Sequence, residues 1–125
     1  MSDEISISDA EWVVMEVVWT RGTARAADVV EDLAEARSWN HRTIRTLLAR
    51  LVEKGALDAT PEGHRYVYTP AVTRRRCVRT EGRSFLEKVF AGDVGSLLLH
   101  FAKESRMSVD DVERLKRMLE EKTDR

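Results

Sequence analysis

The chain has 125 residues and a mass of 14.3 kDa, which suits one domain or two very small ones and excludes a multidomain enzyme. Hydrophobic residues make up 42% and charged residues 34%, so the chain can form a packed core. A single cysteine, Cys77, excludes an internal disulfide and a multi-thiolate metal site. No apolar stretch approaches the roughly 20 residues that span a bilayer, and no signal peptide is evident. We therefore expect a cytoplasmic protein without direct membrane binding.

The net charge of −1 conceals an uneven distribution. Residues 1–35 carry nine acidic and two basic side chains, residues 36–80 carry ten basic and three acidic ones, and residues 81–125 are nearly balanced. One basic block in a nearly neutral protein is typical of a DNA-binding module, because the field that attracts phosphate is local. A solvated helix face rich in arginine would give the same number of charges. The positions of the basic residues must therefore decide between this alternative and a DNA-binding module.

The N-terminal region predicts two helices. Ser8 and Glu11 have the spacing of a capping box, and an apolar stripe runs from there to Trp19. A second helix is expected over 26–36. By residue type, Thr23 is the best candidate for its N-cap.

A third helix and a β-hairpin follow. The helix is expected to start at the N-cap Asn40 and to end before Gly55, and its apolar stripe consists of Ile44, Leu47, Leu48 and Leu51. Strand-like runs at 56–60 and 65–69 flank turn-forming residues at 61–64. Three helices and then a hairpin is the order of a winged helix-turn-helix.

The remaining chain is expected to be helical over 73–90, 96–103 and a last segment capped by Ser108. The predicted fold is mainly α with a small β-hairpin: a winged helix-turn-helix DNA-binding domain over 1–72 and a helical dimerisation domain over 73–125. So small a unit cannot hide its large apolar side chains by itself, and we therefore expect a homodimer. The side chains assigned to the dimer are Phe85, Leu86, Val89, Leu97, Leu98, Phe101, Val112, Leu115 and Leu119.

The face of the third helix opposite its apolar stripe carries arginine, threonine and alanine, which suits the major groove of DNA because arginine binds guanine edges and small residues allow close approach. Polar side chains at the start of the helix suit phosphate. One tyrosine of the hairpin and Trp39 are expected to pack on the core. The candidate DNA contacts are Asn40, His41, Arg42, Thr43, Arg45, Thr46 and Arg50 of the helix and Arg65 and Tyr66 of the hairpin.

Three segments together resemble the penicillinase-repressor (BlaI/MecI/CopY) family. They are residues 7–15 (Ile-Ser-Asp-Ala-Glu-Trp-Val-Val-Met), 42–51 (Arg-Thr-Ile-Arg-Thr-Leu-Leu-Ala-Arg-Leu) and 92–101 (Gly-Asp-Val-Gly-Ser-Leu-Leu-Leu-His-Phe). The resemblance runs from about residue 5 to residue 121. It implies a homodimeric transcriptional repressor whose third helices enter the major groove of a double-stranded, inverted-repeat operator. At matching positions Arg42, Thr43, Arg45 and Thr46 would read or clamp the operator, and Arg50 and Arg65 would contact its backbone.

The same resemblance implies a mode of release. Members of the family are typically cleaved in their C-terminal helices after a membrane-bound sensor metalloprotease detects a β-lactam, and the matching bond here is His100–Phe101. Members cut in this way commonly have asparagine where this chain has His100. The copper-sensing branch ends in paired Cys-x-Cys motifs, which this sequence lacks.

Other classes of function have less support in the sequence than a repressor has. No zinc-protease, Walker or nucleophile-elbow motif is present, so we expect no catalysis, metal or cofactor. An effector-binding regulator that is not controlled by proteolysis is the alternative, with Phe85, Phe90 and Phe101 lining a pocket. Cys77 is either a packing residue, which we favour, or a thiol sensor.

Overall fold

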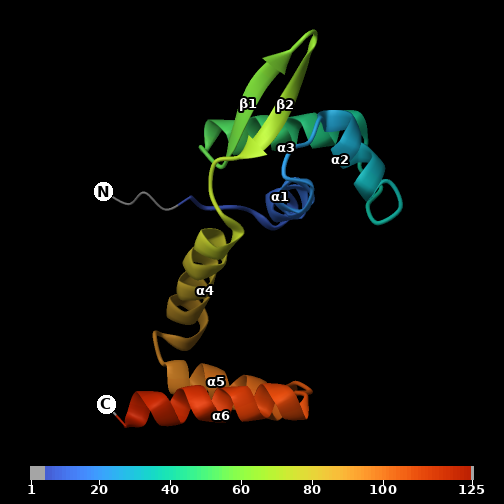
Figure 1. The fold of residues 1–125 in the computed structure, drawn as a ribbon. Coiled ribbons are helices and arrows are strands. Elements are labelled where there is room, and N and C mark those ends of the chain that lie inside the picture. Colours follow the sequence, from blue (N-terminus) through green and yellow to red (C-terminus); the bar gives the residue numbers. More distant parts are fainter. Residues whose placement is uncertain (1–4, 125) are drawn as a thin grey trace. The chain divides into compact units, whose positions relative to one another are not determined.

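The structure is a computed structural model that describes residues 5–124 (Figure 1). Its contacts divide the chain into two units, the first ending at Arg83 and the second beginning at Ser84.

The first unit has the predicted winged-helix order. It comprises α1 (Asp9–Arg21), α2 (Ala26–Leu33), α3 (His41–Glu53), β1 (Leu57–Glu62), β2 (Arg65–Pro70) and the first turns of α4 (Arg74–Phe90). The hairpin stands against α3, and α1 packs against both α3 and β2 (Figure 1). The predicted fold class, mainly α with one small hairpin, is confirmed.

Local side-chain chemistry explains where the helices start. The hydroxyl of Ser8 accepts from the backbone N–H of Glu11, and the Glu11 carboxylate accepts from the N–H of Ser8, so the capping box is confirmed. The side chain of Asn40 accepts from the N–H of Thr43 at 2.9 Å and caps α3 as predicted.

The second helix differs from its prediction at both ends. Its N-cap is Arg25 and not Thr23, because residues 23 and 24 lead into an extended segment in which Ala24 pairs with Tyr68. The helix ends at Leu33 and not at residue 36.

The hairpin is a two-stranded antiparallel sheet in which Leu57 lies opposite Pro70 and Glu62 opposite Arg65. At its turn Gly63 has φ +65°, which a residue with a side chain rarely adopts. Backbone hydrogen bonds in both directions between Ala24 and Tyr68 add the segment before α2 to the edge of β2. We call this hairpin the wing.

The core of the first unit lies between α1, α2, α3 and the wing. Its fully buried members include Val14, Met15, Val18, Val29, Ile44, Leu48, Leu51 and Leu57. Trp39 and Tyr68 pack against it, as predicted for Trp39 and for one tyrosine of the hairpin. The indole N–H of Trp19 donates to the carbonyl of Val72 at 3.0 Å and ties α1 to the segment that precedes α4. The first turns of α4 belong to this core, since Cys77 is buried in it.

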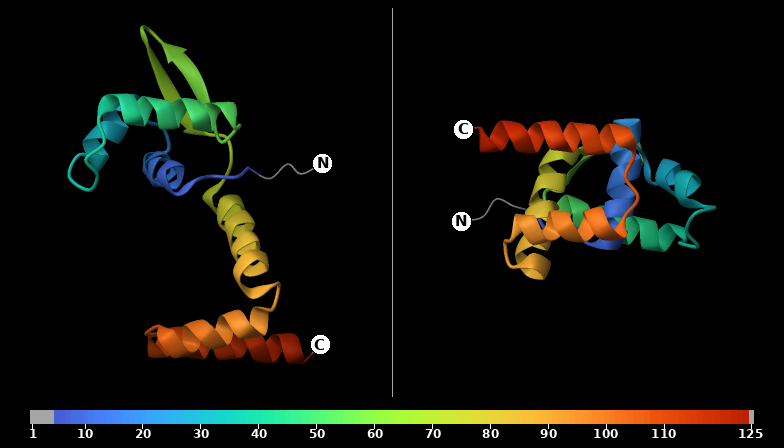
Figure 2. Two further views of the ribbon diagram at one scale, coloured as in Figure 1. Left: turned by 180° about the vertical axis from the view of Figure 1, so that it is seen from behind. Right: turned by 90° about the horizontal axis from the view of Figure 1, so that it is seen from below.

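The second unit consists of the end of α4, α5 (Val94–Glu104) and α6 (Val109–Thr123). Ala91 and Gly92, both at positive φ, end α4, and Asp93 and Ser108 cap α5 and α6. Helices α5 and α6 run in opposite directions (Figure 2), but they do not pack closely on each other in the way the helices of the first unit do. Among residues 84–124 no side chain is fully buried.

Candidate nucleic-acid interface

Helix α3 is strongly two-sided, because its apolar side chains all point into the core. Ile44, Leu47, Leu48 and Leu51 are buried, as the predicted stripe requires. Of the nine candidate DNA contacts only Thr43 is half-buried. The other eight are exposed: Asn40, His41, Arg42, Arg45, Thr46, Arg50, Arg65 and Tyr66.

The guanidinium groups on α3 are available to a ligand. Among the described residues no carboxylate forms a salt bridge with Arg42, Arg45 or Arg50. The hydroxyl of Thr46 donates to the carbonyl of Arg42 at 2.9 Å, so that its methyl group and the oxygen lone pairs remain for an outside contact. This chemistry suits base edges and phosphates.

The wing brings a second set of polar side chains beside α3. Tyr66 is 53% exposed, whereas Tyr68 packs toward the core. Burial, together with the neighbouring Tyr66, raises the pKa of the Tyr68 phenol, and the charge of Arg45 opposes this shift. Tyr68 is therefore a neutral packing residue at neutral pH, and Tyr66 and Arg65 form the outer surface of the wing.

A cleft of about 500 Å³ lies between the starts of α2 and α3 and the wing. We call it the wing cleft. It brings four of the nine predicted contacts together and leaves the other five outside. Its lining residues are Arg25, Ala26, Ala27, His41, Arg45, His64, Arg65, Tyr66 and Tyr68.

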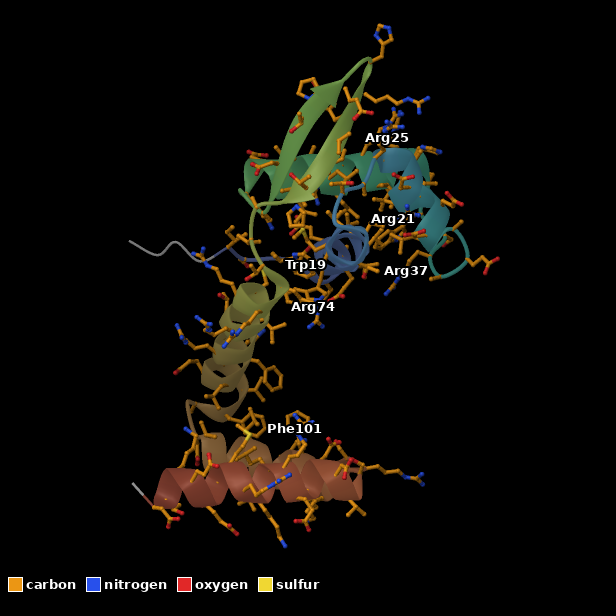
Figure 3. The ribbon with its side chains drawn as sticks, in the orientation of Figure 1. Trp19, Arg21, Arg25, Arg37, Arg74 and Phe101 are labelled. Atoms are coloured by element: carbon orange, nitrogen blue, oxygen red, sulfur yellow. The ribbon has the colours of Figure 1, made fainter. Side chains whose placement is uncertain are left out.

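Sequence reasoning missed Arg25 as a member of this surface. It lies at the start of α2 beside the wing (Figure 3), where its guanidinium forms a salt bridge with Glu62. The residue falls in the acidic block of residues 1–35, so the charge count concealed it. A signal was nevertheless present, because the helix that precedes the recognition helix of a helix-turn-helix crosses the DNA backbone.

The second unit exposes the apolar side chains that the sequence assigned to a dimer. Phe85, Val89, Phe101, Val112 and Leu119 are between 39% and 54% exposed, and Leu86, Leu97, Leu98 and Leu115 are half-buried.

The predicted cleavage bond lies inside α5. His100 and Phe101 are both exposed helical residues whose rings contact each other edge to face, with centroids 5.2 Å apart. Phe101 also lies 6.4 Å from Phe85 and 6.5 Å from Phe90, centroid to centroid. The bond is therefore held in regular helix beside an aromatic cluster.

Two features are missing from residues 5–124, the part of the chain that the structure describes. No helix there is long and apolar enough to cross a membrane, and no group of three or more histidine, cysteine, aspartate or glutamate side chains is arranged to hold a metal ion.

Comparison with known proteins identifies relatives along nearly the whole chain. The model of the penicillinase repressor family matches residues 7–121. The penicillinase repressor of Bacillus licheniformis is 34% identical over 119 residues, which are 95% of this chain and 93% of that protein. The methicillin resistance regulatory protein MecI of Mammaliicoccus sciuri is 34% identical over 116 residues, covering 93% of this chain and 94% of that one.

Solved structures agree with these relatives. The DNA-binding domain of the repressor BlaI is 38% identical with a TM-score of 0.54, covering 61% of this chain and 93% of that domain. Monomeric BlaI of Bacillus licheniformis in complex with the blaP half-operator is 39% identical with a TM-score of 0.50, and the match covers 57% of this chain and 87% of that one. MarR from E. coli, 16% identical with a TM-score of 0.52 over 92% of this chain and 76% of that one, shares the fold. The penicillinase repressor family consists of transcriptional repressors, which are not enzymes, and the chain belongs to this family.

Proposed function

We propose that this chain is a homodimeric transcriptional repressor that binds a double-stranded, inverted-repeat operator. The observation that carries the proposal is the exposed arginine face of α3, where Arg42, Arg45 and Arg50 have no carboxylate partner among the described residues. The related BlaI of Bacillus licheniformis, solved with a half-operator, matches this chain at 39% identity. In our proposal the nine candidate contacts bind the operator: Arg42, Thr43, Arg45 and Thr46 read or clamp it, and Arg50 and Arg65 contact its backbone.

DNA binding and dimerisation belong to different parts of the chain in this proposal. We assign DNA binding to residues 1–72 and dimerisation to residues 73–125, whose α4 also supplies its first turns to the core of the first unit. Exposed apolar side chains on α4, α5 and α6 support a dimer, because burying such a surface against a second copy is strongly favourable.

We further propose that repression ends by proteolysis at His100–Phe101, carried out by a membrane-bound sensor metalloprotease that responds to a β-lactam. Family membership supports this step. The competing effector-binding function gains no support from the aromatic cluster, because Phe85, Phe90 and Phe101 pack on one another with centroids 6.0 to 6.5 Å apart.

Footprinting of the purified protein on the DNA upstream of its own gene tests the repressor function. We expect protection of two half-sites separated by about one helical turn or a multiple of it. A uniform, sequence-independent footprint, or none at low salt, would contradict it. The proteolytic step is tested by immunoblotting: intact full-length protein in fully induced cells would exclude it.

A further inference from the structure

Arg25 is held at the mouth of the wing cleft by its backbone. The preceding residue, Ala24, is paired with Tyr68 in both directions, with N···O distances of 3.0 and 2.7 Å. The N–H of Arg25 donates to the carboxylate of Asp28 at 2.9 Å, which closes the first turn of α2. The main chain of Arg25 is thus fixed to both α2 and the wing, and only its side chain is free to change partners.

In the free protein that side chain is occupied by Glu62 of β1. The side chains of Arg25 and Glu62 are 46% and 54% exposed, and an ion pair so exposed contributes little to stability because water screens it. The carboxylate of Asp28 does not compete with Glu62 for the Arg25 guanidinium. It accepts from the backbone N–H of Arg25, and its other oxygen lies 3.8 Å from a guanidinium nitrogen of Arg21. Glu62 is therefore a weak and replaceable partner.

The rest of the cleft favours an anion. Arg45 and Arg65 line it with two histidines, and no carboxylate does. The first turn of α2 faces it through Ala26 and Ala27, and the carboxylate of Asp28 in the same turn is bonded to the backbone N–H of Arg25. The methyl side chains of Ala26 and Ala27 leave room for a large anion beside the backbone amides of this turn.

We propose that the wing cleft seats a phosphodiester of the DNA backbone and that Arg25 leaves Glu62 to bind it. The inference rests on the proposed DNA-binding function. It adds a phosphodiester as the ligand of the wing cleft and Glu62 as the group that competes with this ligand for Arg25. Glu62 acts as a built-in competitor that lowers the affinity for every duplex equally, because a phosphate contact carries no sequence information.

The test measures dissociation constants for operator and scrambled duplexes at several salt concentrations. Arg25→Ala should weaken binding to both duplexes equally and reduce the slope of log K against log [salt] by about one phosphate contact. Glu62→Gln should tighten binding to both by up to about fivefold, the equivalent of a surface ion pair. In the double variant the gain from Glu62→Gln should vanish, because the released guanidinium is absent.

Asp58→Asn is the matched control. Asp58 is exposed on the same strand and the same face of the wing as Glu62, so its substitution removes an equal charge without releasing Arg25. Weaker binding by Glu62→Gln would show that the ion pair only positions the wing. An equal gain in DNA affinity from Asp58→Asn, or a gain that survives in the double variant, would show that Glu62 only repels DNA through its negative charge. Either result overturns the inference while leaving the repressor function intact, whereas a wild-type protein that does not prefer the operator contradicts the repressor function itself.

Discussion

The carboxylate of Glu11 lies 2.5 Å from the ammonium group of Lys54, although 43 positions separate the two residues in the chain. Glu11 is only 2% exposed. Its carboxylate also accepts from the N–H of Ser8, and Lys54 donates in addition to the carbonyl of Ser6 at 2.8 Å. One buried acid thus joins the start of α1 to the end of α3, and so helps to hold the arginine face of α3 in its orientation.

Replacement of Glu11 by glutamine should destabilise the first unit by about 1–3 kcal/mol. The variant loses the buried, charge-assisted hydrogen bond between residue 11 and Lys54, and the ammonium group of Lys54 loses the negative charge that balances it. Urea unfolding followed by tryptophan fluorescence measures the change. Glu35→Gln, at an exposed position beyond α2, is the control and should be nearly neutral. Equal stability of the two variants would show that the Glu11–Lys54 contact contributes nothing.

Stability should also depend on pH through Glu11. Burial alone would raise the pKa of this carboxyl, but the hydrogen bonds from Lys54 and Ser8 outweigh burial and hold the pKa below its ordinary value. Its contribution is therefore fully present above the unfolded-state pKa of about 4.3 and is lost as the pH falls through the lower folded-state value. As the pH falls, the difference in unfolding free energy between wild type and Glu11→Gln should therefore shrink. A difference that stays constant from pH 7 to pH 3 would show that Glu11 is not responsible for the pH dependence.

Cys77 should behave as an inert packing residue. It is 5% exposed within the core of the first unit, and burial raises the pKa of its thiol, with Arg76 opposing the shift and Glu81 adding to it. The reactive thiolate is therefore scarce at neutral pH. A thiol reagent should react with the native protein far more slowly than with the unfolded chain, and peroxide should leave DNA binding unchanged. Loss of binding in peroxide that Cys77→Ala prevents would restore the thiol-sensor interpretation.

The sequence predicted those parts of the fold that local chemistry determines. Capping by Ser8 and Asn40 and the stripe of α3 follow from side chains within one or two helical turns, and all are confirmed. The N-cap at Arg25 could not be predicted in this way, because pairing between Ala24 and Tyr68, distant in sequence, decides where the extended segment ends and α2 begins.

The same limit applies to the interface. Exposure of Arg45 follows from the periodicity of one helix, so its place on the surface could be predicted. The wing cleft is different, because it depends on the start of α2, the start of α3 and the wing meeting in space. No spacing within a single element indicates that Arg25 and Glu62 form a salt bridge.

Arg45→Ala separates base recognition from simple attraction to phosphate. We expect a loss of about 1–3 kcal/mol in operator binding and weaker discrimination at one base position, measured by titration of operator and single-base variants. Arg79→Ala, which removes an equal charge from an exposed position on α4, is the control and should preserve discrimination. If Arg45→Ala weakens operator and scrambled DNA equally, Arg45 is a phosphate contact.

The dimer should depend on half-buried leucines of the second unit. Leu98→Asp on α5 or Leu115→Asp on α6 would place an unpaired charge in the proposed interface, which is costly because the carboxylate loses its hydration. Sedimentation at micromolar concentration should therefore show monomers. Lys116→Asp changes the charge of an exposed neighbour on α6 and should leave the dimer intact. Circular dichroism must show retained helix in each variant, and a folded, stable dimer of Leu98→Asp and Leu115→Asp would place the contact between copies elsewhere on the chain.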